Sequence, residues 1–304
     1  MTIEIIPFEA ESLLDWHELA DAFVAGHRMP KAEIGDTFLY REPDTLLSRA
    51  AWIDGMGSAV KTATIFPENP ADNLPMVNGG VTLYSDDHGT LEAMVDFHLV
   101  TKWKTAVDSF LGARLLARPD ADCILIVGAG TVAHSLREAY GVLFPHARFQ
   151  VWNRSPAGAE EMAAHFPDTL VASDLESAVM ASDIITCATM TRAPLVMGEW
   201  LQPGQHLDLI GAYRPDMREA DDEAMRRARI FMDSRATVLG HIGELKIPLE
   251  EGVVTPADVQ GDFYDIDAGA FTRAPDDITL FKNGGGAHLD LMTARYILEK
   301  WRSR

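Results

Sequence analysis

Hydrophobic and polar positions in the first third of the chain predict one helix followed by short strands. Between residues 11 and 26 apolar side chains recur about every 3.6 positions, which is typical of an amphipathic helix. Strand-like segments follow at 34–40, 45–53, 59–66, 76–84 and 91–95, separated mainly by Gly, Pro and polar residues. A helix from about 104 to 117 then ends at Arg118-Pro119-Asp120. This order predicts an antiparallel sheet or partial barrel.

After residue 119 the pattern changes to alternating strands and helices. The expected elements cover 123–127, 131–144, 149–152, 157–165, 183–188 and 206–210, and an amphipathic helix is predicted at 289–301. Such alternation is typical of a parallel, doubly wound sheet. We therefore expect an α/β protein with a Rossmann domain over 119–287. An α+β domain with an antiparallel sheet is expected over 1–118, joined by the C-terminal helix at 288–304.

Composition and charge narrow the classes of function. Lys and Arg number 26 and Asp and Glu 46, so the net charge of −20 argues against nucleic acid as a partner. No apolar stretch approaches the roughly 20 residues that span a bilayer, and the acidic N-terminus does not resemble a secretory signal. A cytoplasmic protein without a membrane partner is expected. Cys123 and Cys187 lie in separate apolar segments without metal-ligand spacing, so we expect neither a disulfide nor a metal site.

A glycine motif follows the first strand of the predicted Rossmann domain. The run Cys123–Val127 leads into Gly128-Ala129-Gly130-Thr131-Val132-Ala133, which is G-x-G-x-x-A in a strand, turn and helix context. Gly128 permits the tight turn, Gly130 lets the backbone approach a pyrophosphate, and free amides at the helix start bind phosphate. The alternative is a turn that needs Gly for conformation only. We expect residues 128–132 to bind a nicotinamide dinucleotide.

The end of the second Rossmann strand bears on the choice of cofactor. An acidic residue that binds the ribose of NAD is usual there, but this chain has Asn153, Arg154 and Ser155. Arg pairs with the 2′-phosphate of NADP, and Asn and Ser donate hydrogen bonds to it. NADP(H) is therefore favoured and NAD(H) is possible. Alternatively Arg154 is only a solvated loop cation, and Asn153 holds the ribose of NAD.

Several segments together resemble the ornithine cyclodeaminase and mu-crystallin family from about residue 30 to the C-terminus. The segments are Val60-Lys61-Thr62, Phe66-Pro67-Glu68-Asn69, Thr101-Lys-Trp-Lys104-Thr105-Ala106, the glycine turn, Val151-Trp152-Asn153-Arg154, Gly211-Ala-Tyr-Arg214-Pro215-Asp216-Met-Arg218-Glu219 and Phe281-Lys282-Asn-Gly284. The resemblance implies a first domain that forms a homodimer through its sheet, a second that binds the nicotinamide cofactor, and a substrate in the cleft between them. Its enzymes move hydride between the nicotinamide and an imine carbon next to a carboxylate.

Three lysines match cationic positions of the family. Lys61 matches a lysine that contacts the substrate carboxylate and the reacting nitrogen, although a strand lysine often simply points to water. Lys104 stands where the family usually has Arg, at the start of the predicted helix, so charge is kept but the bidentate grip is lost. Lys31 falls near another carboxylate-binding Arg of the family, in a looser alignment that leaves a surface lysine as the alternative.

Tyr213 departs from the cyclodeaminases proper, which carry an Asp there that handles the substrate amine. Tyr213 either donates a hydrogen bond near the imine or packs against the nicotinamide. Asp216 is expected to cap a helix over 217–228. Thr189, at a strand end, and Asn283, in a glycine-rich turn, are expected beside the cofactor.

These observations favour an NAD(P)H-dependent reductase that converts a small imino acid, such as 1-pyrroline-2-carboxylate, into the L-amino acid. The catalytic candidates are Lys61, Lys104 and Tyr213, and the substrate-binding candidates are Lys31, Lys61 and Lys104. A true ornithine cyclodeaminase and a mu-crystallin-like binding protein without turnover are the alternatives.

Overall fold

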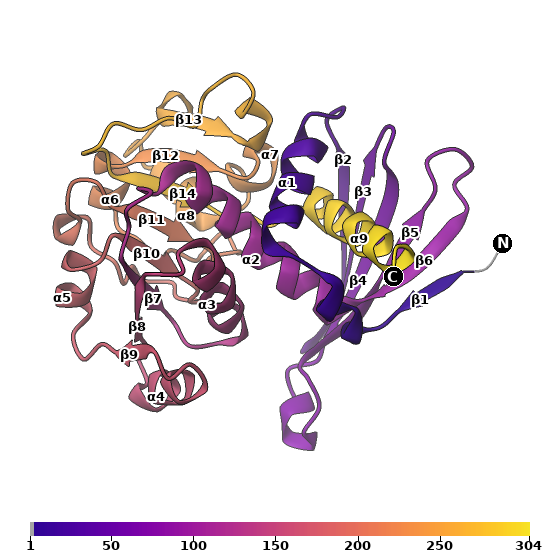
Figure 1. Ribbon diagram of the computed structural model, residues 1–304, viewed down its shortest axis with the longest axis horizontal. Coiled ribbons are helices and arrows are strands. Elements are labelled where there is room, and N and C mark those ends of the chain that lie inside the picture. Colours follow the sequence, from indigo (N-terminus) through magenta and orange to yellow (C-terminus); the bar gives the residue numbers. More distant parts are fainter. Residues whose placement is uncertain (1–2) are drawn as a thin grey trace. The chain divides into compact units, whose positions relative to one another are not determined.

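The computed structural model describes residues 3–304, which form two compact units. Unit 1 comprises the residues up to Lys104 together with 286–304, and unit 2 comprises 105–285. Helix α2 (Phe97–Leu116) contains the point of division (Figure 1). The domain boundary expected at residues 118 and 119 stays a prediction. In each unit a sheet determines where the functional side chains lie.

Unit 1 is built on a six-stranded sheet with the order β1-β6-β5-β4-β3-β2. Strand β1 pairs with β6 in parallel, and the other neighbours are antiparallel, as the short strand-like segments predicted. The strands are β1 (Glu4–Ile6), β2 (Glu33–Arg41), β3 (Asp44–Ile53), β4 (Gly57–Ile65), β5 (Val77–Tyr84) and β6 (Leu91–Asp96).

One face of this sheet is covered by helix α9 (Ala287–Arg302), and α1 (Trp16–His27) packs on that helix. Helix α9 lies against β3 and β4 and beside α1, as Figure 1 shows in yellow and indigo. Asp15 caps α1 by accepting hydrogen bonds from the His17 and Glu18 amides, so the helix begins later than the predicted residue 11. Burial alternates along β4, and the buried face includes Ala59, Lys61 and Ala63.

Two expected helix features are wrong. Helix α2 begins at Phe97 rather than near 104, because β6 runs directly into it and Asp96 accepts a hydrogen bond from the Leu99 amide in the first turn. The expected helix over 217–228 is only α6 (Asp222–Arg227), and its N-cap is Asp221. Asp216 instead pairs with Arg192 and Arg214.

Unit 2 contains a parallel eight-stranded sheet with the order β13-β12-β14-β11-β10-β7-β8-β9. Strand β7 lies between β8 and β10, the point where strand order reverses in a doubly wound sheet and where ligands bind. The strands are β7 (Cys123–Val127), β8 (Arg148–Trp152), β9 (Thr169–Val171), β10 (Ile184–Cys187), β11 (His206–Leu209), β12 (Arg229–Met232), β13 (Val259–Asp262) and β14 (Thr279–Lys282). The helices are α3 (Thr131–Leu143), α4 (Pro156–His165), α5 (Leu175–Met180), α6, α7 (Arg235–Val238) and α8 (Gly243–Glu250).

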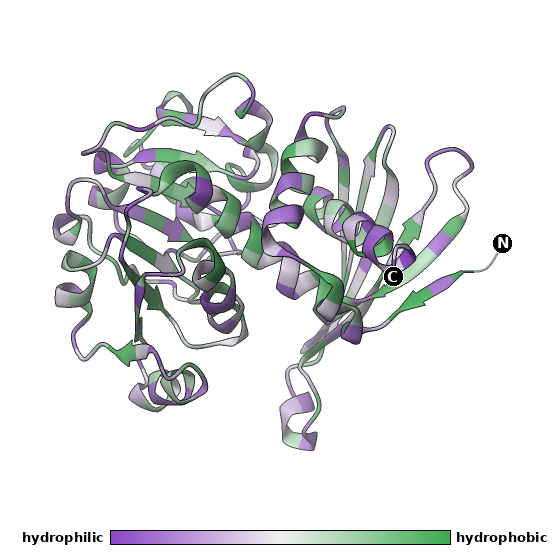
Figure 2. Ribbon diagram, in the orientation of Figure 1, coloured by the Kyte–Doolittle hydropathy of each residue, from purple (hydrophilic) through white to green (hydrophobic). Residues whose placement is uncertain are grey.

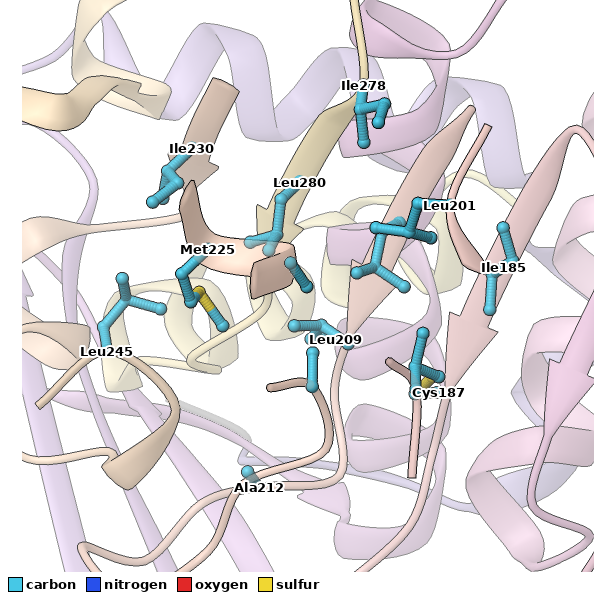
Figure 3. Close-up of a cluster of buried hydrophobic side chains, with 14 of the residues drawn as sticks. Ile185, Cys187, Leu201, Leu209, Ala212, Met225, Ile230, Leu245, Ile278 and Leu280 are labelled. Carbon is cyan, nitrogen blue, oxygen red and sulfur yellow. The ribbon is translucent and has the colours of Figure 1, made fainter. Parts of the chain in front are cut away.

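The central strands of unit 2 are buried on both faces. Every residue of β7 is buried, and the strand is apolar throughout (Figure 2). One cluster of buried side chains includes Ile185, Leu209 and Leu280 from neighbouring strands (Figure 3). Cys123 and Cys187 are buried free thiols in β7 and β10, as expected from their apolar segments. The predicted α/β class with a Rossmann sheet and an antiparallel-sheet domain is confirmed.

Across residues 3–304, the helices are all too short or too polar to span a bilayer. The cytoplasmic location stays a prediction.

Candidate active site

Lys61 lies at the centre of a buried polar cluster in unit 1. Its side chain points to the face of β4 that α9 covers, and only 7% of the residue is exposed. The Nζ atom donates a hydrogen bond of 2.9 Å to Asp290 Oδ1 in the first turn of α9. It also lies 4.8 Å from the centre of the Phe97 ring, a cation–π distance. The alternative that Lys61 simply points to water therefore does not hold.

The charges around Lys61 set its protonation. Burial lowers the pKa of Lys61 to about 8; the attraction of Asp290 opposes this, and repulsion by Lys104 and Arg49 adds to it. Burial would raise the pKa of Asp290, but Lys61, Lys104 and Arg49 outweigh it and keep that pKa below its usual value. Arg49 is itself paired with Asp36, so the buried cations of the cluster are Lys61 and Lys104. A buried ammonium is suited to binding a carboxylate.

The other two predicted substrate lysines differ in their positions. Lys104 is buried in α2, and its charge lowers the pKa of Lys61. Because α2 begins at Phe97, Lys104 lies inside the helix, and its expected place at the helix start is wrong. Lys31 is exposed just after α1, although its charge acts on His288. Their roles with substrate stay predictions.

Sequence reasoning missed several members of this cluster. Asp290 and Arg49 had no motif that singled them out, since Asp290 is 229 positions from its partner Lys61. His27 and His288 are buried with ring centres 5.3 Å apart in an edge-on arrangement. Burial, then His27 and Lys104, hold the pKa of His288 well below its ordinary value, so its ring is neutral. The available hint was a polar pair, His288 and Asp290, in the first turn of an amphipathic helix.

The glycine turn in unit 2 has the geometry that a dinucleotide requires. Gly128 has φ of +112°, and a side chain there would meet the Ala188 carbonyl oxygen at 2.9 Å. The space where a side chain would stand at Gly130 is empty to 4 Å. Gly130 is the N-cap of α3 without a side-chain hydrogen bond, so no side chain caps the first amides. These residues fit a pyrophosphate at the helix start.

The other residues predicted to bind the cofactor lie beside the glycine turn and at the end of β8. Thr131 is exposed, Ala129 and Val132 are half-buried, and Ala133 is fully buried against the sheet, as the motif requires. After β8, Asn153 donates from Nδ2 to the Ser155 carbonyl oxygen at 2.9 Å, which shapes the turn into α4. Arg154 is exposed and carries the charge at the strand end. Their contacts with cofactor stay predictions.

A buried glutamate ties together two loops at the carboxyl edge of the unit 2 sheet. Glu219 accepts hydrogen bonds from the Thr189 amide and hydroxyl through Oε1, and from the Gly211 and Ala212 amides through Oε2. Burial raises the pKa of Glu219 to about 8, against the attraction of Lys282. The four donors favour the ionised form of Glu219, but burial outweighs them. In the sequence, Glu219 was noted only as the last residue of the family segment 211–219.

Tyr213 and Asn283 have contrasting surroundings. Tyr213 follows Gly211 and Ala212, whose amides bind Glu219. It is 59% exposed, so its ring is available to a ligand. Asn283 is buried and donates from Nδ2 to the Thr105 carbonyl oxygen and to Ser109 Oγ. The amide nitrogen of Asn283 thus joins the end of β14 to α2. The expected glycine-rich turn begins only after Phe281 and Lys282, which are strand residues. Their roles beside the nicotinamide stay predictions.

Three known proteins resemble this chain over nearly its whole length. The chain is 50% identical over 296 residues to a Delta(1)-pyrroline-2-carboxylate reductase of Paracoccus denitrificans, covering 95% of this chain and 94% of that protein. A Thermococcus litoralis Delta(1)-pyrroline-2-carboxylate reductase, solved with NADH and L-proline, has a TM-score of 0.89 at 26% identity, covering 99% and 98% of the two chains. An archaeal alanine dehydrogenase dimer with bound NAD has a TM-score of 0.90 at 26% identity, covering 100% and 97%.

The sequence profile of one family matches most of the chain, over residues 52–304. This range contains Lys61, Lys104, the glycine turn and Asp290. The chain therefore belongs to the ornithine cyclodeaminase/mu-crystallin family.

Proposed function

We propose that the chain is an NAD(P)H-dependent reductase that converts a small cyclic imino acid, such as 1-pyrroline-2-carboxylate, into the L-amino acid. The observation that carries the proposal is Lys61, buried among further cations and paired with a single carboxylate, in a chain that also has a dinucleotide-binding turn. The 50% identical Paracoccus relative is named for this activity.

The reaction requires that the substrate carboxylate is bound and that the imine nitrogen is protonated, and residues of unit 1 suit both requirements. Lys61 and Lys104 bind the substrate carboxylate, because a desolvated ammonium pairs strongly with an anion. With its pKa near 8, Lys61 is protonated at neutral pH and gives up a proton more readily than an ordinary lysine, so it protonates the imine nitrogen. When bound, the reduced nicotinamide supplies the hydride to the imine carbon. Residues 128–132 and Thr189 hold that cofactor.

The choice of cofactor follows from the end of β8. Arg154 is an exposed cation there, and Asn153 and Ser155 bring no negative charge that would repel a 2′-phosphate. We infer that NADP(H) is preferred and NAD(H) accepted. The substitution R154A should raise the KM for NADPH about tenfold or more while changing that for NADH little, since a charge-assisted hydrogen bond contributes about 1.5–3 kcal/mol. Equal effects on both cofactors would refute the assignment.

A homodimer through the sheet of unit 1 is also proposed. Every residue of β2 is exposed, and Phe38, Leu39 and Tyr40 lie on it with Trp52 on the next strand. A shallow groove of about 350 Å³ crosses β2, β3 and β4. An apolar edge strand of this length is a liability unless another surface covers it. The archaeal alanine dehydrogenase that this fold resembles is a dimer.

The test is oxidation of NADPH and NADH with 1-pyrroline-2-carboxylate and with its six-membered analogue, beside ornithine with NAD as a control for ammonia release. We expect cofactor oxidation matched by L-amino acid formation and no ammonia from ornithine, because Tyr213 replaces the cyclodeaminase Asp. Ammonia release would instead identify a cyclodeaminase. Ligand binding without turnover of either substrate would identify a binding protein.

A further inference from the structure

Among the described residues of unit 1, Asp290 is the one buried acidic side chain. The residue is 1% exposed, and its Oδ1 accepts the hydrogen bond from Lys61. Its Oδ2 is equally buried and has no hydrogen-bond partner among residues 3–304. A buried carboxylate normally gathers several donors, because an oxygen without one is costly. The hydrogen bonding of Asp290 within the described chain is thus directed entirely to Lys61.

We propose that Asp290 is a positioning residue for the reaction: its carboxylate holds Lys61 Nζ in the orientation in which the ammonium meets the substrate. The proposal rests on the function proposed above. Three features support it: the 2.9 Å contact, the burial of both side chains, and the place of Asp290 in the first turn of the helix that covers β4. Phe97, whose ring lies beside Nζ, offers no hydrogen-bond acceptor, so Asp290 supplies the directional contact.

The same pair explains how a lysine among cations stays protonated. Lys104 on α2 and Arg49 on β3 both disfavour the Lys61 ammonium, and burial disfavours it further. Asp290 on α9 is the one acidic group among the main influences on Lys61. Without that charge the lysine would lose its proton near neutral pH and bind the substrate anion poorly.

The proton step is then balanced. Lys61 transfers one Nζ proton to the imine nitrogen, so an Nζ–H bond breaks, an N–H bond forms, and the electron pair stays on Nζ. The imine carbon is reduced by the hydride while the nicotinamide is oxidised. Lys61 regains a proton from water, and Asp290 keeps its charge throughout.

The substitution D290N tests this role because it removes the charge with little change in shape. Acetylation of Lys61 by acetic anhydride, followed across pH by peptide mass spectrometry, measures the Lys61 pKa without any turnover. We expect a value near 8 in the wild type and a value lower by about one unit or more in D290N. We also expect kcat/KM for the imino acid to fall about tenfold or more, with its alkaline limb moved to lower pH and NADPH affinity unchanged.

The matched control is T293V, which removes another buried oxygen of α9 that lacks a described hydrogen-bond partner. It should leave both the Lys61 pKa and kcat/KM as in the wild type. A smaller variant, D290S, should shift the pKa in the same direction as D290N, so the result does not depend on one folded variant. An unchanged Lys61 pKa in both Asp290 variants would overturn the proposal. Absence of imine reduction by the wild type would overturn the proposed function, while acetylation still tests the pair.

Discussion

Single residues set the chemistry of this site through burial and charge. A lysine on a strand usually points to solvent, but Lys61 lies on the covered face of β4 beside Asp290, with Lys104 in the same field. The family resemblance indicated Lys61 and Lys104 as candidates, and their roles stay predictions. It could not identify Asp290, Arg49 or His288, because those neighbours are created by folding between distant segments and leave no local pattern.

Lys104 should act mainly in substrate binding. The substitution K104M is expected to raise the KM for 1-pyrroline-2-carboxylate about 10–100-fold with a smaller change in kcat, because a hydrogen bond to a charged group is worth about 1.5–3 kcal/mol. Steady-state kinetics with saturating cofactor measures this. The control K102M removes a nearby lysine of α2 that pairs with Glu11, and it should change KM little. If both variants kept the wild-type KM, Lys104 would have no role in binding.

The pH dependence of kcat/KM should follow Lys61. The pKa of its ammonium is about 8 in the folded protein, below its ordinary value, so the charge is present below pH 8 and lost above it. Because the substrate anion needs that charge, kcat/KM should fall about tenfold per pH unit above 8. Steady-state rates from pH 6 to 10, corrected for ionisation of the free imine, check this. A flat profile to pH 10 would contradict the assignment.

Elements bring these residues together, and most elements were predictable. Apolar runs predicted β7 and β10 well, because strands buried on both faces are uninterrupted. The start of α2 was missed because no Gly or Pro separates it from β6. The sequence also did not predict that Glu219 connects the loops after β10 and β11 by hydrogen bonds, because Glu219 lies in neither strand.

Glu219 should determine the stability of those loops. The substitution E219Q places an amide group against backbone donors, and each buried donor left without an acceptor costs about 1–3 kcal/mol. We expect a free energy of unfolding lower by at least about 2 kcal/mol and weaker NADPH binding. Urea unfolding and fluorescence titration measure the two effects. The half-buried Glu223, which pairs with Arg226, provides the control E223Q, and this variant should change neither quantity. Wild-type values in E219Q would contradict the role.

At the scale of the whole molecule, the fold class and the family could be predicted from the sequence. The exposed surface of strand β2 could not. The exposure of β2 along its length follows from the sheet order: β3 pairs with one edge of β2, and no strand within residues 3–304 pairs with the other. The resemblance suggested a dimer, and this exposed edge indicates where it would form.

The proposed dimer leads to a direct prediction of mass. The substitution L39D places a charge on β2, where Leu39 is 62% exposed, and it should convert a dimer into a monomer. Leu170, 65% exposed on β9 in unit 2, provides the control L170D, which should remain dimeric. Light scattering after size exclusion measures both masses. A monomeric wild type at micromolar concentration, or a dimeric L39D variant, would contradict this interface.

In the proposed reaction, hydride moves from the reduced nicotinamide to the imine carbon next to the substrate carboxylate. The most direct measurement uses NADPH carrying deuterium at the transferable position of the nicotinamide, with 1-pyrroline-2-carboxylate as substrate and mass spectrometry of the product. We predict L-proline with one deuterium at its α-carbon for each NADPH oxidised, and none with K61M. Proline without deuterium, or cofactor oxidation without proline, would contradict the account.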